Sequence, residues 1–135
     1  MLRYGAQTAD RVGLTGTGRT LADGHTHEVD WSTAALARTV DAVRTAARGR
    51  TPVLDVLVQH IELTDDAERA AAKLADLVPG VTAADLLVTP FVWIGTAVEI
   101  VDRLRALQRD HGIDRYTVRV PTMGDVQRVL EFWPT

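Results

Sequence analysis

The stretch TPFVWIGTAVEIVDRLRALQRDHGIDRYTVRV (Thr89–Val120) decides the fold. Thr96 and Glu99 have the T-x-x-E spacing of a capping box, in which each side chain accepts a hydrogen bond from the other residue's backbone N–H. Gly112 suits the left-handed position just past a helix end. Between these two signals, apolar residues recur at helical spacing: Ile100, Leu104 and Leu107. The sequence therefore predicts an amphipathic helix that starts at Thr96 and stops at Gly112.

A strand is predicted directly after this helix, over Arg115–Val120. Its apolar and polar residues alternate, as in a strand with one covered face: Tyr116, Val118 and Val120 against Arg115, Thr117 and Arg119. A helix that returns through a short loop to a strand is half of a βαβ unit, so the neighbouring strands are expected to be parallel.

Outward from this stretch, caps and periodicity predict the remaining elements. Helices are expected over Leu2–Ala9, from Asp30 or Ser32 to about Arg48, 64–78, Ala83–Leu87 and Met123–Phe132. Strands are expected over Asp10–Thr15 and Val53–Leu63. Phe91–Ile94 is apolar and leads into the helix that Thr96 starts. The order is α-β-α-β-α-α-α-β-α, an α/β fold.

Three strands are too few to close a barrel, and they leave two unpaired edges. A short parallel sheet with helices on one face also leaves its other face bare. Another copy of the chain, a different chain, or one of the helices folded back is expected to cover it.

The composition is that of an ordinary globular chain, with 46% hydrophobic and 24% charged residues. Its 135 residues suit a single domain. The net charge of −3 and the absence of a polybasic run predict no nucleic-acid or anionic-lipid partner. Without cysteine, the chain has no disulfide and no thiolate chemistry.

No apolar run approaches the ~20 residues of a membrane-spanning helix. The first residues, MLRYGAQTAD, lack the apolar core of a signal peptide. A cytoplasmic protein without membrane contact is the expectation.

The glycine-rich segment TGTGRT (Thr15–Thr20) is the first candidate site. It follows a predicted strand, so its backbone amides could cradle a phosphate, with Arg19 pairing to it. It lacks the lysine of a Walker motif, and no helix follows directly. A flexible turn is the more common explanation of such a segment.

Arg119 is the second candidate, because ligands bind at the carboxyl ends of parallel strands. Gln59 and His60 are expected near the same edge. The alternative is that Arg119 pairs with Asp55 or Glu62 on a neighbouring strand.

Two further motifs each have a functional and a more common structural explanation. His25, His27 and Asp30 are donor types that zinc or iron accepts, but such groups are frequent in surface loops, and no metal site is predicted. Trp93 could stack on a ring system, although a core aromatic is the more common role. The sequence has no nucleophile elbow and no placed carboxylate pair, so no catalytic residue is assigned.

Three segments carry a resemblance to a family: Ala9–Ser32, Thr89–Leu107 and Gly112–Pro121. Together they resemble the C-terminal part of the luciferase-like monooxygenases, and especially the actinobacterial oxidoreductases that use a deazaflavin coenzyme. The resemblance implies a (βα)₈ barrel in full-length relatives, with FMN or deazaflavin at its carboxyl-end mouth. This chain would supply only part of it, a half-barrel-like sheet of three to four parallel strands. The cofactor contacts implied are Thr15, Gly16, Thr17, Gly18, Arg19 and Arg119.

Two functions follow from the missing strands. The first is a half-barrel that forms a homodimer through its sheet edges, with no catalytic activity of its own. The second is a flavin- or deazaflavin-dependent oxidoreductase or monooxygenase whose site forms across a dimer or with an N-terminal partner. A small-molecule or anion-binding module without turnover is a third possibility.

Overall fold

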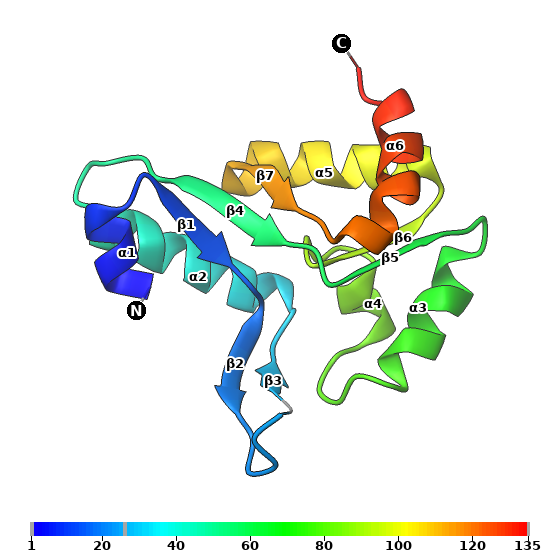
Figure 1. Cartoon of the computed structure of the whole chain (residues 1–135), viewed down its shortest axis with the longest axis horizontal. Coiled ribbons are helices and arrows are strands. Elements are labelled where there is room, and N and C mark those ends of the chain that lie inside the picture. Colours follow the sequence, from blue (N-terminus) through cyan, green and yellow to red (C-terminus); the bar gives the residue numbers. More distant parts are fainter. Residues whose placement is uncertain (1, 26, 135) are drawn as a thin grey trace.

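The computed structural model describes residues 2–25 and 27–134, and for Arg19 the backbone alone. Figure 1 shows its elements in chain order. The helices are α1 (Leu2–Thr8), α2 (Thr33–Ala46), α3 (Ala67–Ala75), α4 (Ala83–Leu86), α5 (Ala97–His111) and α6 (Met123–Glu131), the last after a 3-10 turn η1 (Val120–Thr122). The strands are β1 (Arg11–Leu14), β2 (Thr17–Thr20), β3 (His27–Val29), β4 (Val53–Leu57), β5 (His60–Leu63), β6 (Val92–Gly95) and β7 (Ile113–Thr117).

The helix α5 confirms the signals from which it was predicted. The backbone N of Thr96 donates to Glu99 Oε2 at 2.8 Å, and the backbone N of Glu99 donates to Thr96 Oγ1 at 3.3 Å. Gly112 ends the helix in the left-handed region, with φ 68°. Because both ends are fixed by local contacts, α5 begins and ends where the sequence places it.

The main sheet has the strand order β1-β4-β7, and both pairings are parallel. A second parallel pair joins β5 to β6, and β2 and β3 form an antiparallel hairpin. The prediction of an α/β fold with a parallel sheet and covering helices is therefore confirmed.

The prediction of one long strand over Val53–Leu63 is wrong, because the chain changes partner at Val58 and Gln59. The backbone N of Val58 donates to Thr117 O at 2.9 Å, and the backbone N of Gln59 donates to Phe91 O at 2.7 Å. Successive amides thus bond to two different segments, and the run divides into β4 and β5. The apolar residues after Phe91 form a strand of their own, β6.

The last strand begins and ends earlier than its alternating pattern predicts. Ile113 is fully buried and already pairs with Leu54, so β7 starts right after Gly112. It ends at Thr117, and the chain then turns into η1, which contains Pro121. The pairing stops there because Val58 N donates to Thr117 O and the next amide, Gln59 N, donates to Phe91 O instead.

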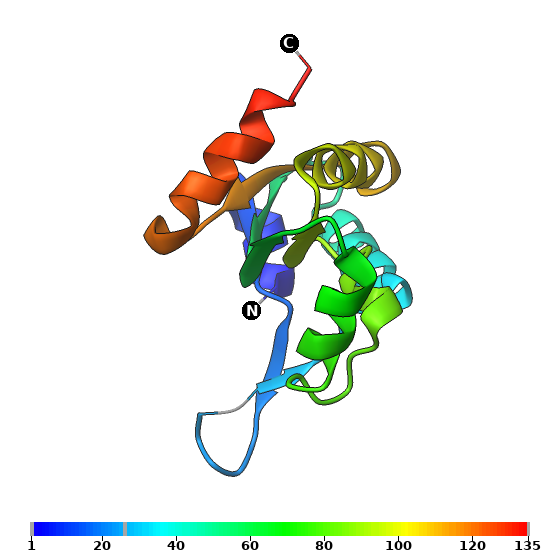
Figure 2. The same ribbon diagram turned by 90° about the vertical axis from the view of Figure 1, so that its right-hand side faces the viewer.

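The sheet buries its apolar side chains on the face that α2 and α5 cover, including Val12, Leu54 and Val56. Figure 2 shows α2 and α5 on this side of the strands and α6 on the other. The helix α6 packs against α5 and β5. Among the described residues, the contacts of α6 are mainly with α5 and β5 and not with the strands of the main sheet, so the expected covering of its other face by a helix folded back is not found there.

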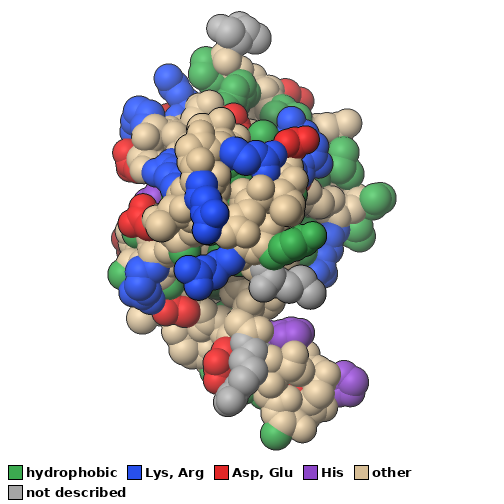
Figure 3. Space-filling view, turned by 90° about the vertical axis from the view of Figure 1, so that its left-hand side faces the viewer, with side chains coloured by type: hydrophobic (Ala, Val, Ile, Leu, Met, Phe, Trp, Pro, Cys, Tyr) green, Lys and Arg blue, Asp and Glu red, His purple; other side chains and the backbone are tan. Residues whose placement is uncertain are grey.

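Basic side chains gather where the strands begin, on the side of the molecule that Figure 3 shows. Two arginine side chains donate hydrogen bonds to residues at or near the C-terminal ends of α5 and α1. Arg44 donates to His111 O at 2.8 Å, and Arg50 donates to Gln7 O and Asp10 Oδ1, both at 2.8 Å.

Along residues 2–25 and 27–134, no helix is both long and apolar enough to cross a membrane.

Candidate functional site

The uncovered face of the main sheet is polar. Gly13, Asp55 and Arg115 lie side by side in the strand register, and Leu57 lies beside Thr117. Paired residues of a sheet point to the same face, and alternate residues point to the opposite one. This face therefore presents glycine, charges and a hydroxyl where the other presents buried aliphatic side chains.

Asp55 is the buried centre of this polar face. Only 9% of the residue is exposed. Its Oδ1 accepts a hydrogen bond from Thr117 Oγ1 at 2.9 Å, and its Oδ2 lies 3.6 Å from Arg11 Nη1. Glu62 lies 3.3 Å from His60 Nε2. The predicted pairing of Arg119 with Asp55 or Glu62 is therefore wrong, because both carboxylates have other partners.

Gln59 connects two of the predicted site residues across the carboxyl ends of the strands. Its Nε2 donates to Thr15 O at 3.0 Å, and its Oε1 accepts from Arg119 Nη2 at 3.3 Å. The residue lies in the break between β4 and β5, where its side chain can reach the ends of both β1 and β7. Thr15 and Arg119 are thus brought to one edge of the sheet.

The glycine-rich segment forms a turn at Gly16 and then a strand, β2. Gly16 makes the turn with φ 68°, and its carbonyl accepts a hydrogen bond from Trp31 Nε1 at 3.0 Å. The hydroxyls of Thr15 and Thr17 lie 2.9 Å apart. From Thr17 the chain continues as β2, which holds Gly18 and the backbone of Arg19. The Arg19 side chain lies outside the described part of the chain.

A cavity of about 420 Å³ lies between this segment and α2. It is lined by residues 13–18, by one face of α2 including Arg38, by Asp30 and by the ring of Phe91. Four of the six predicted cofactor contacts line it: Thr15, Gly16, Thr17 and Gly18. Arg119 is not among the residues that line this cavity.

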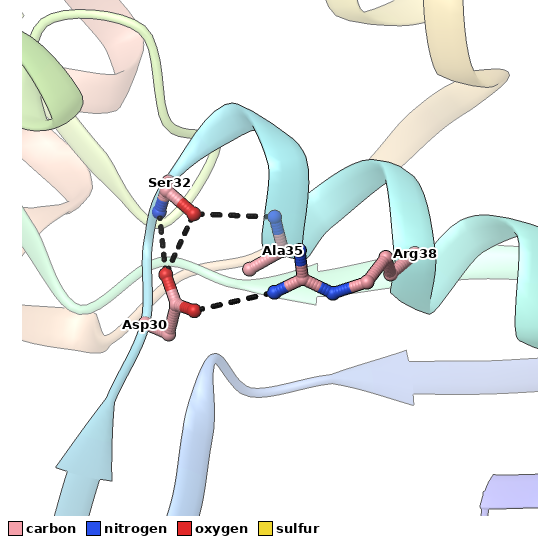
Figure 4. Close-up of polar contacts among 4 residues, drawn as sticks. All are labelled: Asp30, Ser32, Ala35 and Arg38. Atoms are coloured by element: carbon pink, nitrogen blue, oxygen red, sulfur yellow. Dashed lines mark hydrogen bonds and ion pairs between the residues drawn. The ribbon is translucent and has the colours of Figure 1, made fainter.

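Asp30 and Arg38 are the charged residues that line the cavity, and Figure 4 shows the contacts between them and Ser32. Asp30 Oδ1 accepts from the backbone N of Ser32 at 3.2 Å and from its Oγ at 2.7 Å, and Oδ2 accepts from Arg38 Nη2 at 3.4 Å. These bonds from Ser32, with the nearby Arg38, lower the pKa of Asp30. Ser32 in turn accepts from Ala35 N at 3.2 Å and caps α2. The charged form of the carboxylate is therefore favoured, and its hydrogen bond from Arg38 keeps that side chain near the N-terminal end of α2.

Sequence reasoning missed Arg38 and Phe91, which belong to the cavity. One signal for Arg38 was present: small residues at helical spacing flank it and leave room beside the helix: Ala35, Thr39 and Ala42. Phe91 carried no such signal, because its place depends on β6 pairing with β5.

His27 and Asp30, two of the three donor residues considered for a metal, have other contacts in the structure. His27 Nδ1 lies 3.2 Å from Thr20 Oγ1, and the carboxylate of Asp30 is bound to Ser32 and Arg38. Within residues 2–25 and 27–134, no three His, Asp or Glu side chains are grouped as ligands for a metal ion. Trp93 is 4% exposed and packs edge-on against Tyr116, with 5.5 Å between ring centroids, so it is a core aromatic.

The cavity thus offers a guanidinium group paired with a carboxylate, three threonine side chains and an aromatic ring. Such a set can hold an anionic or phosphate-bearing molecule with a planar ring. No family model, no curated protein and no solved structure matches the chain.

Proposed function

We propose that the protein binds a phosphate-bearing cofactor of the flavin or deazaflavin class in the cavity beside residues 13–18. The observation that carries this proposal is the meeting of four predicted contact residues with Arg38 and Phe91 around one space of about 420 Å³. That volume lies in the range of roughly 300–1,000 Å³ that small-molecule sites occupy. The luciferase-like resemblance of the sequence supports the choice of cofactor.

The polar groups of the cavity fit an anion at one end. Arg38 uses one guanidinium nitrogen for Asp30, and the guanidinium group has further N–H groups for a phosphate. Of the paired hydroxyls of Thr15 and Thr17, one donates to the other, and the second has its proton free for the same oxygens. Phe91 offers its ring, which already stacks on Trp31 with 6.1 Å between centroids. A flavin or deazaflavin would supply hydride transfer when bound, and these residues would bind and orient it.

The proposed scaffold is a partial (βα) barrel whose strands pair in a different order from those of a complete barrel. In a complete barrel, each strand lies beside the next one along the chain. Here β7 pairs with β4, while β6 pairs with β5. The parallel pairings and the covering of one sheet face by α2 and α5 support the barrel origin, and the changed order arises where the chain changes partner between Val58 and Gln59.

Replacing Arg38 by glutamine is expected to weaken FMN binding about tenfold, because a charge-assisted bond to phosphate is lost. Titration of the protein with FMN, followed by quenching of flavin fluorescence and by the thermal shift, measures the change. Arg105→Gln is the matched control, since Arg105 is exposed on α5 and lines none of the cavities described. If neither FMN nor deazaflavin binds at saturating concentration, the proposed function is wrong.

Self-association through the edge of β1 is the second candidate function. The strand β1 pairs with β4 on one side only. Since the backbone N of Val53 donates to Asp10 O, the alternation of a parallel ladder directs the N–H of Gly13 to the unpaired side. The outer edge of β6 is closed within the chain, because Arg103 donates to Val92 O at 3.4 Å and to Ile94 O at 2.9 Å.

The edge of β1 also borders the cavity, which Gly13 and Leu14 help to line. A second copy paired there would add a wall to the cofactor site. The homodimer and the oxidoreductase alternative are therefore compatible, with the site formed across two copies.

Gly13→Pro is expected to turn a dimer into a monomer, since proline removes the outward N–H and leaves the bonds to β4 in place. Light scattering over a range of protein concentrations measures the mass. Gly13→Ala keeps the N–H and meets no atom within 4 Å, so it should remain dimeric. A wild-type chain that is monomeric at every concentration contradicts self-association, whatever the variants do.

A further inference from the structure

A second cavity lies away from the cofactor site, between β7, α5 and α6 (Figure 1). Its volume is about 530 Å³. Most of its wall is aliphatic or aromatic and comes from all three elements and from β6: Leu104, Val118, Val126, Val129, Trp93 and Tyr116.

Among the described residues that line this cavity, two have a buried polar atom without a hydrogen-bond partner: Trp93 Nε1 and Tyr116 OH. Unpaired buried polar atoms are rare in folded proteins, and each one raises the free energy of the folded state. Two of them in the wall of one apolar cavity form a pair of unused donors. Thr89 Oγ1, a third unpaired atom, belongs to a residue that lines a different cavity.

Both groups are donors in the folded chain. An indole nitrogen can only donate. Burial, with Asp114 nearby, raises the pKa of the Tyr116 hydroxyl, so this hydroxyl keeps its proton. The pair is therefore suited to an acceptor atom, such as a carbonyl oxygen.

We propose that this cavity binds a neutral, planar aromatic molecule whose carbonyl-type oxygen accepts hydrogen bonds from Trp93 Nε1 and Tyr116 OH. Small-molecule sites combine an apolar wall with a few placed polar groups, and this wall has that composition. Aromatic faces and edges of Trp93, Tyr116 and Trp133 line the space and favour a flat ring.

The charges around the cavity favour a neutral ligand. Of the described residues that line it, Asp114 alone carries a charge. Its carboxylate repels an anion, and the two donors require an acceptor oxygen on the ligand, which a neutral carbonyl compound supplies. The chemistry differs from that of the cofactor cavity, where Arg38 favours phosphate.

The ligand must displace part of α6 to reach the donors, because both polar atoms are closed off from solvent. The helix is the last one of the chain and is held by only two buried residues, Val126 and Val129. No side chain caps its first turn. A helix with only two buried residues and no side-chain cap opens at low free energy compared with the core of the fold.

Binding can be tested with Prodan, a neutral and flat naphthyl ketone whose fluorescence responds to hydrogen bonding. Tyr116→Phe removes one donor and keeps the ring. It should weaken Prodan binding about tenfold, the change expected for one hydrogen bond to a buried carbonyl. Naphthalene has the ring without the carbonyl, and its affinity should change less than about twofold in the same variant. Trp93→Phe should show the same contrast between the two molecules.

Folding controls keep the test decisive. Without ligand, Tyr116→Phe should melt at or above the wild-type temperature, because it deletes an unpaired buried hydroxyl. Thr89→Val removes the third unpaired hydroxyl and should leave Prodan binding unchanged. If the wild type does not bind Prodan, or if Tyr116→Phe and Trp93→Phe bind it as well as the wild type, the two donors serve no ligand and the proposal is overturned.

Discussion

Replacing Gly16 by alanine is expected to lower the free energy of unfolding by about 3–5 kcal/mol, the sum of a backbone and a packing effect. Gly16 has φ 68°, a region that residues with a Cβ rarely adopt. A Cβ there would also lie 2.5 Å from Trp31 Nε1 and 3.0 Å from the ring of Phe91. Urea unfolding, followed by circular dichroism, measures the loss.

The packing effect is the larger of the two, because neither neighbour can easily move. Trp31 is 7% exposed and Phe91 is 5% exposed, and the two rings stack on each other. Moving the indole also breaks the bond from its Nε1 to Gly16 O and leaves a buried donor without a partner. An added methyl group at this turn is therefore resisted by both aromatic side chains.

Two other glycines separate the effects. Gly24 has φ 74° but no atom within 4 Å of an added Cβ, so Gly24→Ala should lower the free energy of unfolding by only about 1 kcal/mol. Gly13→Ala has neither problem and should be neutral or slightly stabilising. If Gly16→Ala proves no worse than Gly24→Ala, then Trp31 and Phe91 do not fix the turn.

The elements predicted well are those whose signals are local. The helix α5 begins with two residues three apart and ends with a single glycine, and all three make contacts within one turn of themselves. The strand β1 and the helix α2 follow similar short-range patterns, and α2 is capped by Ser32. Signals of this kind act before any tertiary contact forms, so they can be read from one sequence.

The elements missed are those that depend on a partner distant in the sequence. The run Val53–Leu63 is near-continuously apolar in its middle, and the polar pair Gln59-His60 does not by itself indicate a change of partner. Whether it continues as one strand depends on the positions of Thr117 and Phe91, which are far along the chain. The hairpin of β2 and β3 was hidden by its glycine content, since glycine disfavours strands as well as helices.

The candidate site was predicted in part for the same reason. Glycines and threonines at the end of β1 identified residues 15–18 as a wall, because such residues mark a turn where backbone approaches closely. Arg119 was placed at the correct edge by its position after a strand. Gln59 joins it to Thr15, yet that link crosses three strands and has no counterpart in any local pattern.

Replacing Arg103 by methionine is expected to lower the free energy of unfolding by about 3 kcal/mol, because two charge-assisted hydrogen bonds are lost while most of the apolar side chain is kept. Arg103 donates to Val92 O at 3.4 Å and to Ile94 O at 2.9 Å. Both residues are fully buried, so without the guanidinium the carbonyls of the outer edge of β6 have no partner. Burial lowers the pKa of Arg103, an effect that Glu99 partly offsets.

The guanidinium of Arg103 donates to the β6 carbonyls as a neighbouring strand would. Two control variants separate this effect from a loss of charge. Arg105→Met on the same helix removes an exposed charge and should change the free energy of unfolding by less than about 0.5 kcal/mol. Arg103→Lys keeps the charge but loses the fork that spans two carbonyls, so it should fall between the wild type and Arg103→Met. Unfolding in guanidinium chloride gives the free energy of unfolding of each of the three variants and so their order of stability. Equal stability of Arg103→Met and Arg105→Met would mean that the carbonyls at the edge of β6 do not depend on Arg103.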